Sequence, residues 1–266
     1  MNFRDYANEN YESVLKVIRD LCAIPAPSHF EDERAEYCKR FLEENGAVGV
    51  YIDEAKNVIY PLGCEGSGEI TVIAAHTDTV FPDREPMPLT EDDEKIYCPG
   101  VYDDTVEVAV LLHTAVYFAK YAAKNKGGLL FVCNSCEEGL GNLKGTRAIM
   151  SAYEGRIKQF ISYDCTGGIV DRAVGSSRFE VEIKTEGGHS FSNFGNTNAI
   201  AVMADIITKI YSVEVPKIEN TKTTYNVGIV SGGTSVNTIA QNAKMLCEYR
   251  SDSAECLEIM KGKSLK

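Results

Sequence analysis

One histidine and several acidic residues follow short apolar segments of the sequence, and these residue types can hold metal ions. His76 and Asp78 come directly after the apolar run 70–75. Residues two apart in an extended chain face the same way, so the Asp78 carboxylate can bind one ring nitrogen of His76 while the other binds a metal. Taken alone, the pair is more typical of a surface histidine beside an aspartate.

Two carboxylate pairs also stand at the ends of predicted elements. Asp103 and Asp104 open a predicted helix, where they either bridge metal ions or simply cap the helix and offset its dipole. Glu137 and Glu138 leave a predicted strand. Because adjacent residues leaving a strand point in different directions, one can ligate a metal while the other acts on its water as a general base.

A further acid, Asp164, follows another predicted strand and by itself reads as an ordinary loop carboxylate. Taken together, however, these residues gather at the carboxyl ends of successive strands, where ligands bind in α/β sheets. One histidine with several carboxylates forms a nitrogen and oxygen ligand set suited to zinc, manganese or cobalt. The sequence therefore predicts a metal site at the ends of these strands.

The elements that must position these residues alternate along the chain. A helix is predicted over 11–21, and a second one runs to about Glu44, with Ser28 and Glu31 at the spacing of a capping box. Strands follow at 70–75, 129–134 and 160–163, with helices at 106–121 and 145–152. This alternation predicts an α/β fold with a mostly parallel sheet and helices on both faces.

From Arg178 the pattern changes to a smaller α+β domain. It predicts strands at 179–184, 223–230 and 245–249 and helices at 198–211 and 254–261. The order β-α-β-β-α is one strand short of a split βαβ unit. We therefore expect a catalytic domain over 1–177 and a second domain over 178–266.

The motifs in this order resemble those of the M20 family of metallopeptidases and amidohydrolases. H-T-D-T-V at 76–80, G-x-x-D-D at 100–104, E-E-G at 137–139 and G-G-H-S at 187–190 carry the resemblance, which covers nearly the whole chain. The family includes carboxypeptidase G-type, tripeptidase-type and succinyl-diaminopimelate desuccinylase-type enzymes.

The resemblance implies two zinc ions per subunit, with cobalt or manganese as alternatives. Their implied ligands are His76 and Asp164 for one ion, Glu138 for the second, and Asp103 as a bridge between them. It also implies that Asp78 orients His76 and that Glu137 is the general base.

The second domain resembles the family's lid, or dimerisation, domain. Its G-G-H-S histidine, here His189, is implied to reach the active site of a partner subunit and to stabilise the oxyanion. Asn237 matches the lid's asparagine-bearing loop, and Arg250 lies where the family holds a substrate carboxylate, for which its guanidinium fork is suited. A turn histidine and a solvated strand-end arginine are the alternatives. A homodimer through this domain is expected.

The remaining histidines and the cysteines are predicted to be structural. His29 stands at a helix start and His113 within an apolar helix. The nine cysteines are scattered and form no CxxC pair. We expect reduced, mostly buried thiols rather than disulfides or a zinc-thiolate site.

Composition excludes several other classes of protein. A formal net charge of −12 argues against nucleic acid or an anionic membrane as a partner, since both need a basic face. No apolar run approaches the roughly 18 residues that span a bilayer. The N-terminus lacks the profile of a signal peptide, so a cytoplasmic location is expected. No G-x-G-x-x-G or phosphate loop supports a nucleotide-binding domain.

Members of the family run beyond this length, and their chain returns to the catalytic domain to supply a last histidine to the second metal. No histidine follows His189 in this sequence. We therefore expect a C-terminally truncated chain whose second metal site is one ligand short.

The leading hypothesis is metal-dependent hydrolysis of peptide or amide bonds in small substrates, of the di- or tripeptide aminopeptidase type. Deacylation of N-acyl amino acids is the enzymatic alternative, since both kinds of substrate present a carboxylate to Arg250. A non-catalytic relative that folds and dimerises without turnover is the alternative from another class.

Overall fold

The computed structural model describes residues 1–66, 68–121, 127–164, 168–171 and 173–264. The chain divides into two compact units, residues 1–167 and 168–266. The boundary expected at residue 177 falls inside strand β8 (Gly175–Lys184), which belongs to the second unit. The apolar alternation of β8 begins only at Phe179, because its first three residues are glycine and serines.

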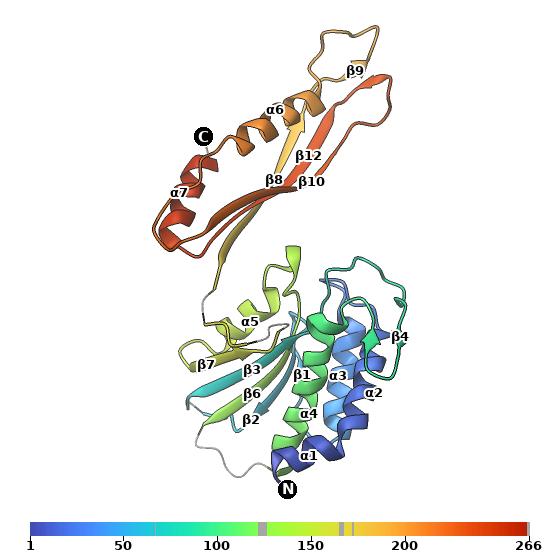
Figure 1. Ribbon diagram of the computed structural model, residues 1–266, viewed down its shortest axis with the longest axis vertical. Coiled ribbons are helices and arrows are strands. Elements are labelled where there is room, and N and C mark those ends of the chain that lie inside the picture. Colours follow the sequence, from blue (N-terminus) through green and yellow to red (C-terminus); the bar gives the residue numbers. More distant parts are fainter. Residues whose placement is uncertain (67, 122–126, 165–167, 172, 265–266) are drawn as a thin grey trace. The chain divides into compact units, whose positions relative to one another are not determined.

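The first unit is built on a five-stranded sheet with the order β1-β2-β6-β3-β7 (Figure 1). Strand β3 (Ile70–His76) lies parallel to both β6 (Gly128–Asn134) and β7 (Ile157–Ser162). Strand β2 (Val58–Leu62) is antiparallel to β6, and the two-residue β1 (Tyr51–Ile52) is antiparallel to β2. The predicted α/β fold is confirmed, with an antiparallel edge that the sequence did not reveal.

Alternate residues of β3 enter two different cores. Ile73 and Ala75 belong to the larger apolar cluster, which also contains residues of α2 (Tyr11–Cys22), α3 (Asp32–Glu44) and α4 (Val106–Tyr121). Val72 and Ala74 belong to a smaller cluster with Ile149 of α5 (Lys144–Ala152). A strand buried on both faces reads as a continuous apolar run, so β3 shows no alternation in the sequence.

The N-terminal region differs in part from the prediction. An additional helix, α1 (Phe3–Glu9), precedes α2. Helix α3 begins at Asp32, after Glu31 as the N-cap residue, and no side chain caps it. The predicted capping box is therefore wrong, because Ser28 and Glu31 are drawn into contacts with other segments instead.

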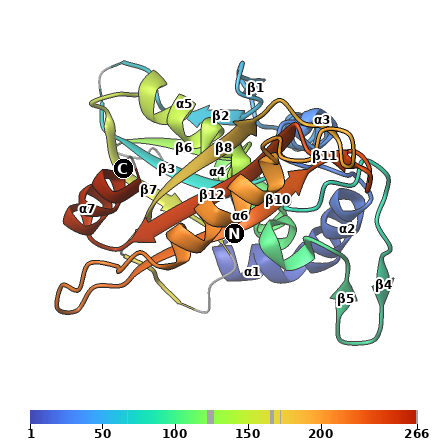
Figure 2. The ribbon, with the colours of Figure 1, turned by 90° about the horizontal axis from the view of Figure 1, so that it is seen from above.

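Short elements complete the first unit. Strands β4 (Thr90–Glu91) and β5 (Ile96–Tyr97) form a small hairpin that projects from it (Figure 2). A kinked turn (η1, Val101–Thr105), in which Asp103 and Asp104 have non-helical backbone angles, leads into α4, and a 3₁₀ turn (η2, Gly139–Gly141) precedes α5. No helix in the described ranges is both long and apolar enough to cross a membrane.

The second unit is an antiparallel sheet with the order β10-β12-β8 and helices on one face (Figures 1 and 2). Its long strands are β8, β10 (Thr223–Gly232) and β12 (Asn242–Ser251). Helix α6 (Ala199–Tyr211) lies between β8 and β10 in the chain, and α7 (Ala254–Ser264) follows β12. The two-residue strands β9 (Gly188–His189) and β11 (Thr238–Ile239) pair separately. The predicted order of elements and the α+β class are confirmed.

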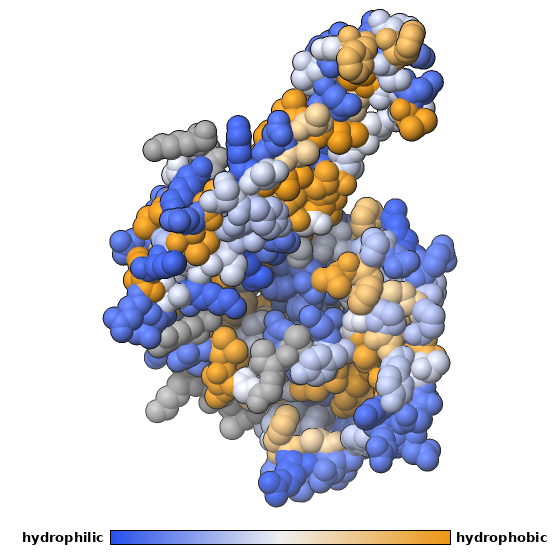
Figure 3. Space-filling view, turned by 45° about the horizontal axis from the view of Figure 1, so that its top comes forward, coloured by the Kyte–Doolittle hydropathy of each residue, from blue (hydrophilic) through white to orange (hydrophobic). Residues whose placement is uncertain are grey.

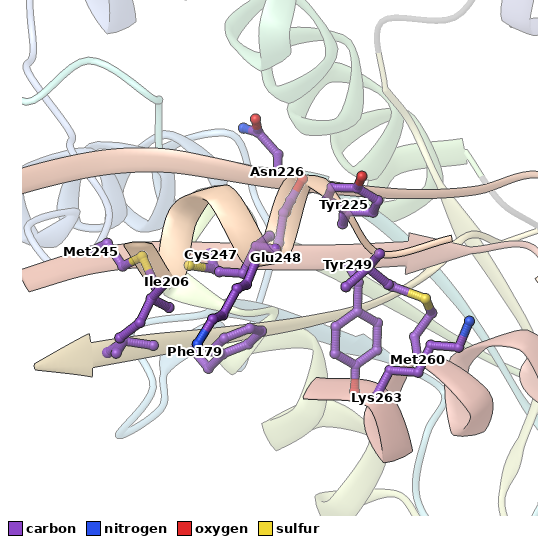
Figure 4. Close-up of a pocket in the computed structure, with 14 residues that line it drawn as sticks. Phe179, Ile206, Tyr225, Asn226, Met245, Cys247, Glu248, Tyr249, Met260 and Lys263 are labelled. Carbon is purple, nitrogen blue, oxygen red and sulfur yellow. The ribbon is translucent and has the colours of Figure 1, made fainter. Parts of the chain in front are cut away.

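An apolar cavity of about 330 Å³ lies between α6, α7 and this sheet. Figure 4 shows its lining, with Phe179 and Tyr249 from the sheet, Ile206 from α6 and Met260 from α7. The cavity belongs to the packing of the second unit alone.

Candidate metal centre

His76 is the last residue of β3 and is almost fully buried. Its Nδ1 lies 3.0 Å from the backbone oxygen of Asp78 and 3.5 Å from the carboxylate Oδ1 of the same residue. The hydrogen bond from Nδ1 to the carbonyl turns Nε2 toward Asp103, whose Oδ1 is 3.0 Å away. Asp78 thus contacts His76 mainly through its main chain rather than through the predicted carboxylate.

The Asp78 carboxylate instead joins the histidine segment to the two glutamates. It is fully buried and accepts hydrogen bonds from Ser28 Oγ at 2.6 Å, from Glu137 N at 2.9 Å and from Glu138 N at 3.0 Å. Burial by itself would raise the pKa of Asp78, but the hydrogen bonds outweigh it and hold the pKa below its usual value. Asp78 is therefore ionised and holds the start of the E-E-G segment.

All the ligand candidates of the first unit come together around His76. Ligand atoms of His76, Asp103 and Asp164 lie within 4.8 Å of one another, and so do those of His76, Glu137 and Glu138. Imidazole and carboxylate donors at this separation fit a borderline divalent cation such as zinc, cobalt or manganese. The sequence predicted each of these residues, and the fold gathers them at the carboxyl ends of β3, β6 and β7 and at the turn before α4.

The electrostatics of this cluster favour a cation. Burial raises the pKa of Glu138 to about 7, and it raises the pKa of Glu137 as well. Burial alone would lower the pKa of His76, yet hydrogen bonds with Asp103 and Asp78 raise it to about 11. Carboxylates this close repel one another, so a proton on the imidazole or a bound cation offsets their charge.

Asp104 is a further acid, beside this cluster, whose role the sequence did not define. It is fully buried, and its Oδ2 accepts a hydrogen bond of 2.8 Å from the backbone N–H of His76. Burial raises the pKa of Asp104 to about 8. The Asp103–Asp104 peptide bond is cis. The neighbouring aspartates thus differ in task, since Asp103 faces the imidazole ring and Asp104 holds the main chain of the same histidine.

Arg34, on the first turns of α3, was also missed. Its guanidinium is buried and donates to Ile24 O at 2.8 Å, to Thr77 O at 3.0 Å and to Thr105 Oγ1 at 3.2 Å. Arg34 therefore ties the histidine segment to the turn that carries the aspartates. The only signal in the sequence was a charged residue within a helix, which is usually solvated.

The candidates of the second unit lie around the β9–β11 pair and on β12. His189 is exposed, and its Nδ1 accepts hydrogen bonds from Phe191 N at 3.2 Å and Ser192 N at 3.4 Å. Asn237 accepts a hydrogen bond of 2.7 Å from Ser235 Oγ, and Arg250 is exposed on β12. Their predicted parts in a joint site with the first unit stay predictions.

The histidines and cysteines expected to be structural have protein neighbours. His113 packs against Phe41 with ring centroids 5.2 Å apart, and burial lowers its pKa. His29 Nδ1 lies 3.3 Å from the Cys136 sulfur. As predicted, the cysteines within the described residues are free thiols and all but Cys98 are buried, while Cys165 lies outside those residues.

Comparison with known proteins decides the family. The family described as "Peptidase family M20/M25/M40" matches residues 72–248, which include every ligand candidate named above. The chain belongs to this family. The predicted resemblance to M20 enzymes is thereby confirmed.

Curated M20 relatives include two deacylating enzymes. The chain is 27% identical over 225 residues to an acetylornithine deacetylase of Myxococcus xanthus, covering 80% of this chain and 56% of that protein. It is 25% identical over 237 residues to a succinyl-diaminopimelate desuccinylase of Corynebacterium glutamicum, covering 86% of this chain and 64% of the relative. The chain therefore spans less than two thirds of the length of these relatives.

Solved structures share the M20 fold. An aminobenzoyl-glutamate utilization protein from Klebsiella pneumoniae aligns with a TM-score of 0.72 at 14% identity, covering 100% of this chain and 73% of that one. Aminopeptidase PepT from Bacillus cereus gives 0.63 at 21% identity, with coverages of 95% and 69%. A dinuclear metal-binding M20 peptidase from Bacillus subtilis gives 0.56 at 19%, with coverages of 95% and 67%.

Proposed function

We propose that this M20 chain hydrolyses an amide bond in a small substrate at a metal centre built by its first unit. The observation that carries the proposal is the convergence of His76 with Asp103 and Asp164 and with Glu137 and Glu138. These residues come from four segments of the chain, and a purely structural histidine would not require so many acids around it.

The proposed ligands would give one cation three protein ligands and the other only two. His76, Asp103 and Asp164 would hold one, and Asp103 with Glu138 would hold the other. When bound, such cations polarise the substrate carbonyl and lower the pKa of a water molecule. Asp103 and Glu138 include no imidazole, so we expect the second cation to exchange more readily than the first.

Glu137 is the proposed general base. It takes a proton from the attacking water and returns it to the leaving amine. Its pKa is raised by burial, which brings it closer to the pH at which a base must both accept and release a proton. The hydrogen bond from its backbone N–H to Asp78 holds the main chain at Glu137 in place. Glu138, one residue later, is left to bind metal.

The second unit is proposed to contact the substrate and to form a homodimer. Two backbone N–H groups donate to His189 Nδ1, so the neutral ring carries its proton on Nε2. That N–H can donate to the oxygen of a reacting carbonyl, as the oxyanion role requires. Arg250 is proposed to bind the substrate carboxylate, and Asn237 to act beside His189 across the β9–β11 pair.

N-acyl amino acids are the proposed substrate class, ahead of di- and tripeptides. The support is that the curated relatives named above are deacylases and align over most of this chain. The solved aminopeptidase, at 21% identity, supports the fold alone. Both substrate classes offer an amide bond and a carboxylate, so the metal centre itself does not separate them.

The test is a substrate panel assayed with the chain loaded with zinc, cobalt or manganese. N-Acetyl and N-succinyl amino acids should release amine, tripeptides should react more slowly, and a chelator should stop both reactions. Faster release of amine from tripeptides than from N-acyl amino acids would instead favour the aminopeptidase function expected from the sequence. Metal binding without turnover of any amide would support the non-catalytic alternative.

A further inference from the structure

The backbone that presents Glu137 and Glu138 passes through an unfavourable conformation. Cys136, the residue before Glu137, has φ +52°, in the left-handed region that residues with a Cβ rarely occupy. His29, which contacts the Cys136 sulfur, has φ +76°. Neither residue is glycine, so other contacts must hold these two conformations in place.

Glu31 supplies those contacts from the start of α3. It is fully buried, and its Oε1 accepts hydrogen bonds from His29 N at 2.8 Å, from Cys136 N at 3.1 Å and from Cys136 Sγ at 3.1 Å. A single carboxylate oxygen thus holds the backbone of both left-handed residues. Lys56 Nζ, 3.9 Å from Oε2, is the cation nearest to this carboxylate among the ion pairs of the described residues.

Together, Glu31 and Asp78 hold three consecutive backbone N–H groups. Glu31 accepts from Cys136, and Asp78 accepts from Glu137 and Glu138. The directions in which the two glutamate side chains leave the main chain are therefore set by two buried carboxylates from distant segments. Asp78 adjoins the metal centre, whereas Glu31 acts on it through Cys136.

We propose that Glu31 is a positioning residue for the metal centre, an inference that rests on the proposed function. Its buried carboxylate keeps Cys136 in the left-handed conformation and so aims Glu138 at the cation and Glu137 at the water. Without this acceptor the backbone N–H of Cys136 is unsatisfied, and the segment relaxes to a conformation in which the two glutamates diverge from His76.

The test compares Glu31→Met, Glu31→Asp and Glu31→Gln with the parent chain. Methionine keeps most of the volume but removes the acceptor, aspartate keeps the charge but shortens the reach, and glutamine keeps an acceptor oxygen at the same length. Leu42→Ala, in the core part of the same helix, is the control for lost stability. Each chain is titrated with Co²⁺, whose visible absorption reports on the ligands around it.

We expect Glu31→Met and Glu31→Asp to weaken Co²⁺ binding by about 10-fold or more, the usual scale for residues that orient metal ligands, and to change the Co²⁺ spectrum. Glu31→Gln should stay within about threefold of the parent chain, well below that scale. Leu42→Ala should lower the melting temperature and leave Co²⁺ affinity and spectrum unchanged.

Hydrogen exchange of the metal-free chains separates this inference from the proposed function. The amides of Cys136, Glu137 and Glu138 should exchange faster in Glu31→Met than in the parent chain or in Leu42→Ala. Parent-like Co²⁺ binding and parent-like exchange in Glu31→Met would overturn the positioning role; if that variant does not fold, Glu31→Asp decides by the same criteria. A parent chain that binds no Co²⁺ would overturn the proposed function, while the exchange data would still decide the role of Glu31.

Discussion

At the scale of single residues, acidic side chains that are adjacent in the sequence make different contacts at the metal centre. Asp103 faces the ring of His76, while Asp104 binds the N–H of the same residue. Glu137 and Glu138 have similar backbone contacts through Asp78, and ligand atoms of both lie within 4.8 Å of each other and of His76. Two neighbouring carboxylates thus contact different parts of the same histidine, one its ring and the other its main chain.

Separate substitution of Glu137 and Glu138 by glutamine tests which of them is the base and which the metal ligand. Glu137→Gln should lower turnover by about 100-fold or more, because an amide cannot accept the proton of water, and should leave metal content nearly unchanged. Glu138→Gln should lose metal. Elemental analysis and amide hydrolysis are the measurements, with the exposed Glu154→Gln as the control. Metal loss in Glu137→Gln, with metal kept in Glu138→Gln, would mean that the two roles are reversed.

The raised pKa values predict how the stability of the metal-free chain depends on pH. Burial moves the pKa of Asp104 from 3.8 to about 8 and that of Glu138 from 4.5 to about 7. A carboxyl group whose pKa is higher in the folded than in the unfolded state stabilises the fold at pH values below its unfolded-state pKa. This stabilisation is lost as the pH rises through its folded-state pKa. The chelated chain should therefore melt at a lower temperature at pH 8.5 than at pH 5.

Asp104→Asn provides the control for this pH dependence, because an amide does not titrate. The fall in melting temperature between pH 5 and pH 8.5 should be smaller in this variant. Added Zn²⁺ should raise the melting temperature of the parent chain most at the higher pH, where protons no longer compete for the carboxylates. An unchanged slope in Asp104→Asn would show that Asp104 does not titrate in this range.

At the scale of elements, helix α3 does more than cover one face of the sheet. Its apolar side enters the larger core through Ala35, Cys38 and Leu42. Its N-terminal end carries Glu31, as N-cap residue, and Arg34, which hold segments from three other parts of the chain. One helix thus stabilises the fold along its length and positions the metal centre at its beginning.

Arg34 should contribute strongly to stability. Arg34→Leu removes the donor from two carbonyl oxygens and one hydroxyl, so we expect a loss of about 3 kcal/mol in the free energy of unfolding. Arg34→Lys should recover only part of it, because an ammonium lacks the planar fork that reaches separated acceptors. Urea unfolding measures both. Full recovery by lysine would show that only the charge matters.

At the scale of the whole molecule, the second unit has surfaces suited to another copy of the chain. Strands β8 and β10 are the edges of its three-stranded sheet. Phe191, Phe194 and Val236, beside β9 and β11, are 88%, 89% and 102% exposed, and Figure 3 shows apolar surface at this end of the unit. Unpaired strand edges and exposed apolar groups are features that a two-fold partner can cover.

Mixing two inactive variants tests the proposed dimer and the role of His189 across it. His189→Ala and Glu137→Gln should each be inactive alone. A heterodimer would contain one site with an intact Glu137 and an intact His189 from the other subunit, so mixing should restore part of the turnover. Sedimentation should show a dimer at micromolar concentration. Only monomer, or dimer without restored turnover, would contradict the proposal.

Local patterns in the sequence determined most of the helices and strands and the residue types that gather at the metal centre. Helix α4 was predicted with its observed bounds, Val106–Tyr121. Strands β3 and β6 were each predicted to within one residue of their observed bounds, because apolar periodicity and strand length are properties of neighbouring residues. The acids of the cluster were found for the same reason, since each belongs to a short motif.

Only the tertiary structure decided which atoms meet. Ser28 donates to Asp78, 50 residues away, instead of capping α3, and Glu31 binds the backbone of Cys136, 105 residues away. Asp78 contacts His76 mainly through its carbonyl, while its carboxylate accepts hydrogen bonds from the backbone of the two glutamates. A polar side chain bonds to whichever partner the fold buries beside it, and a local pattern does not contain that partner.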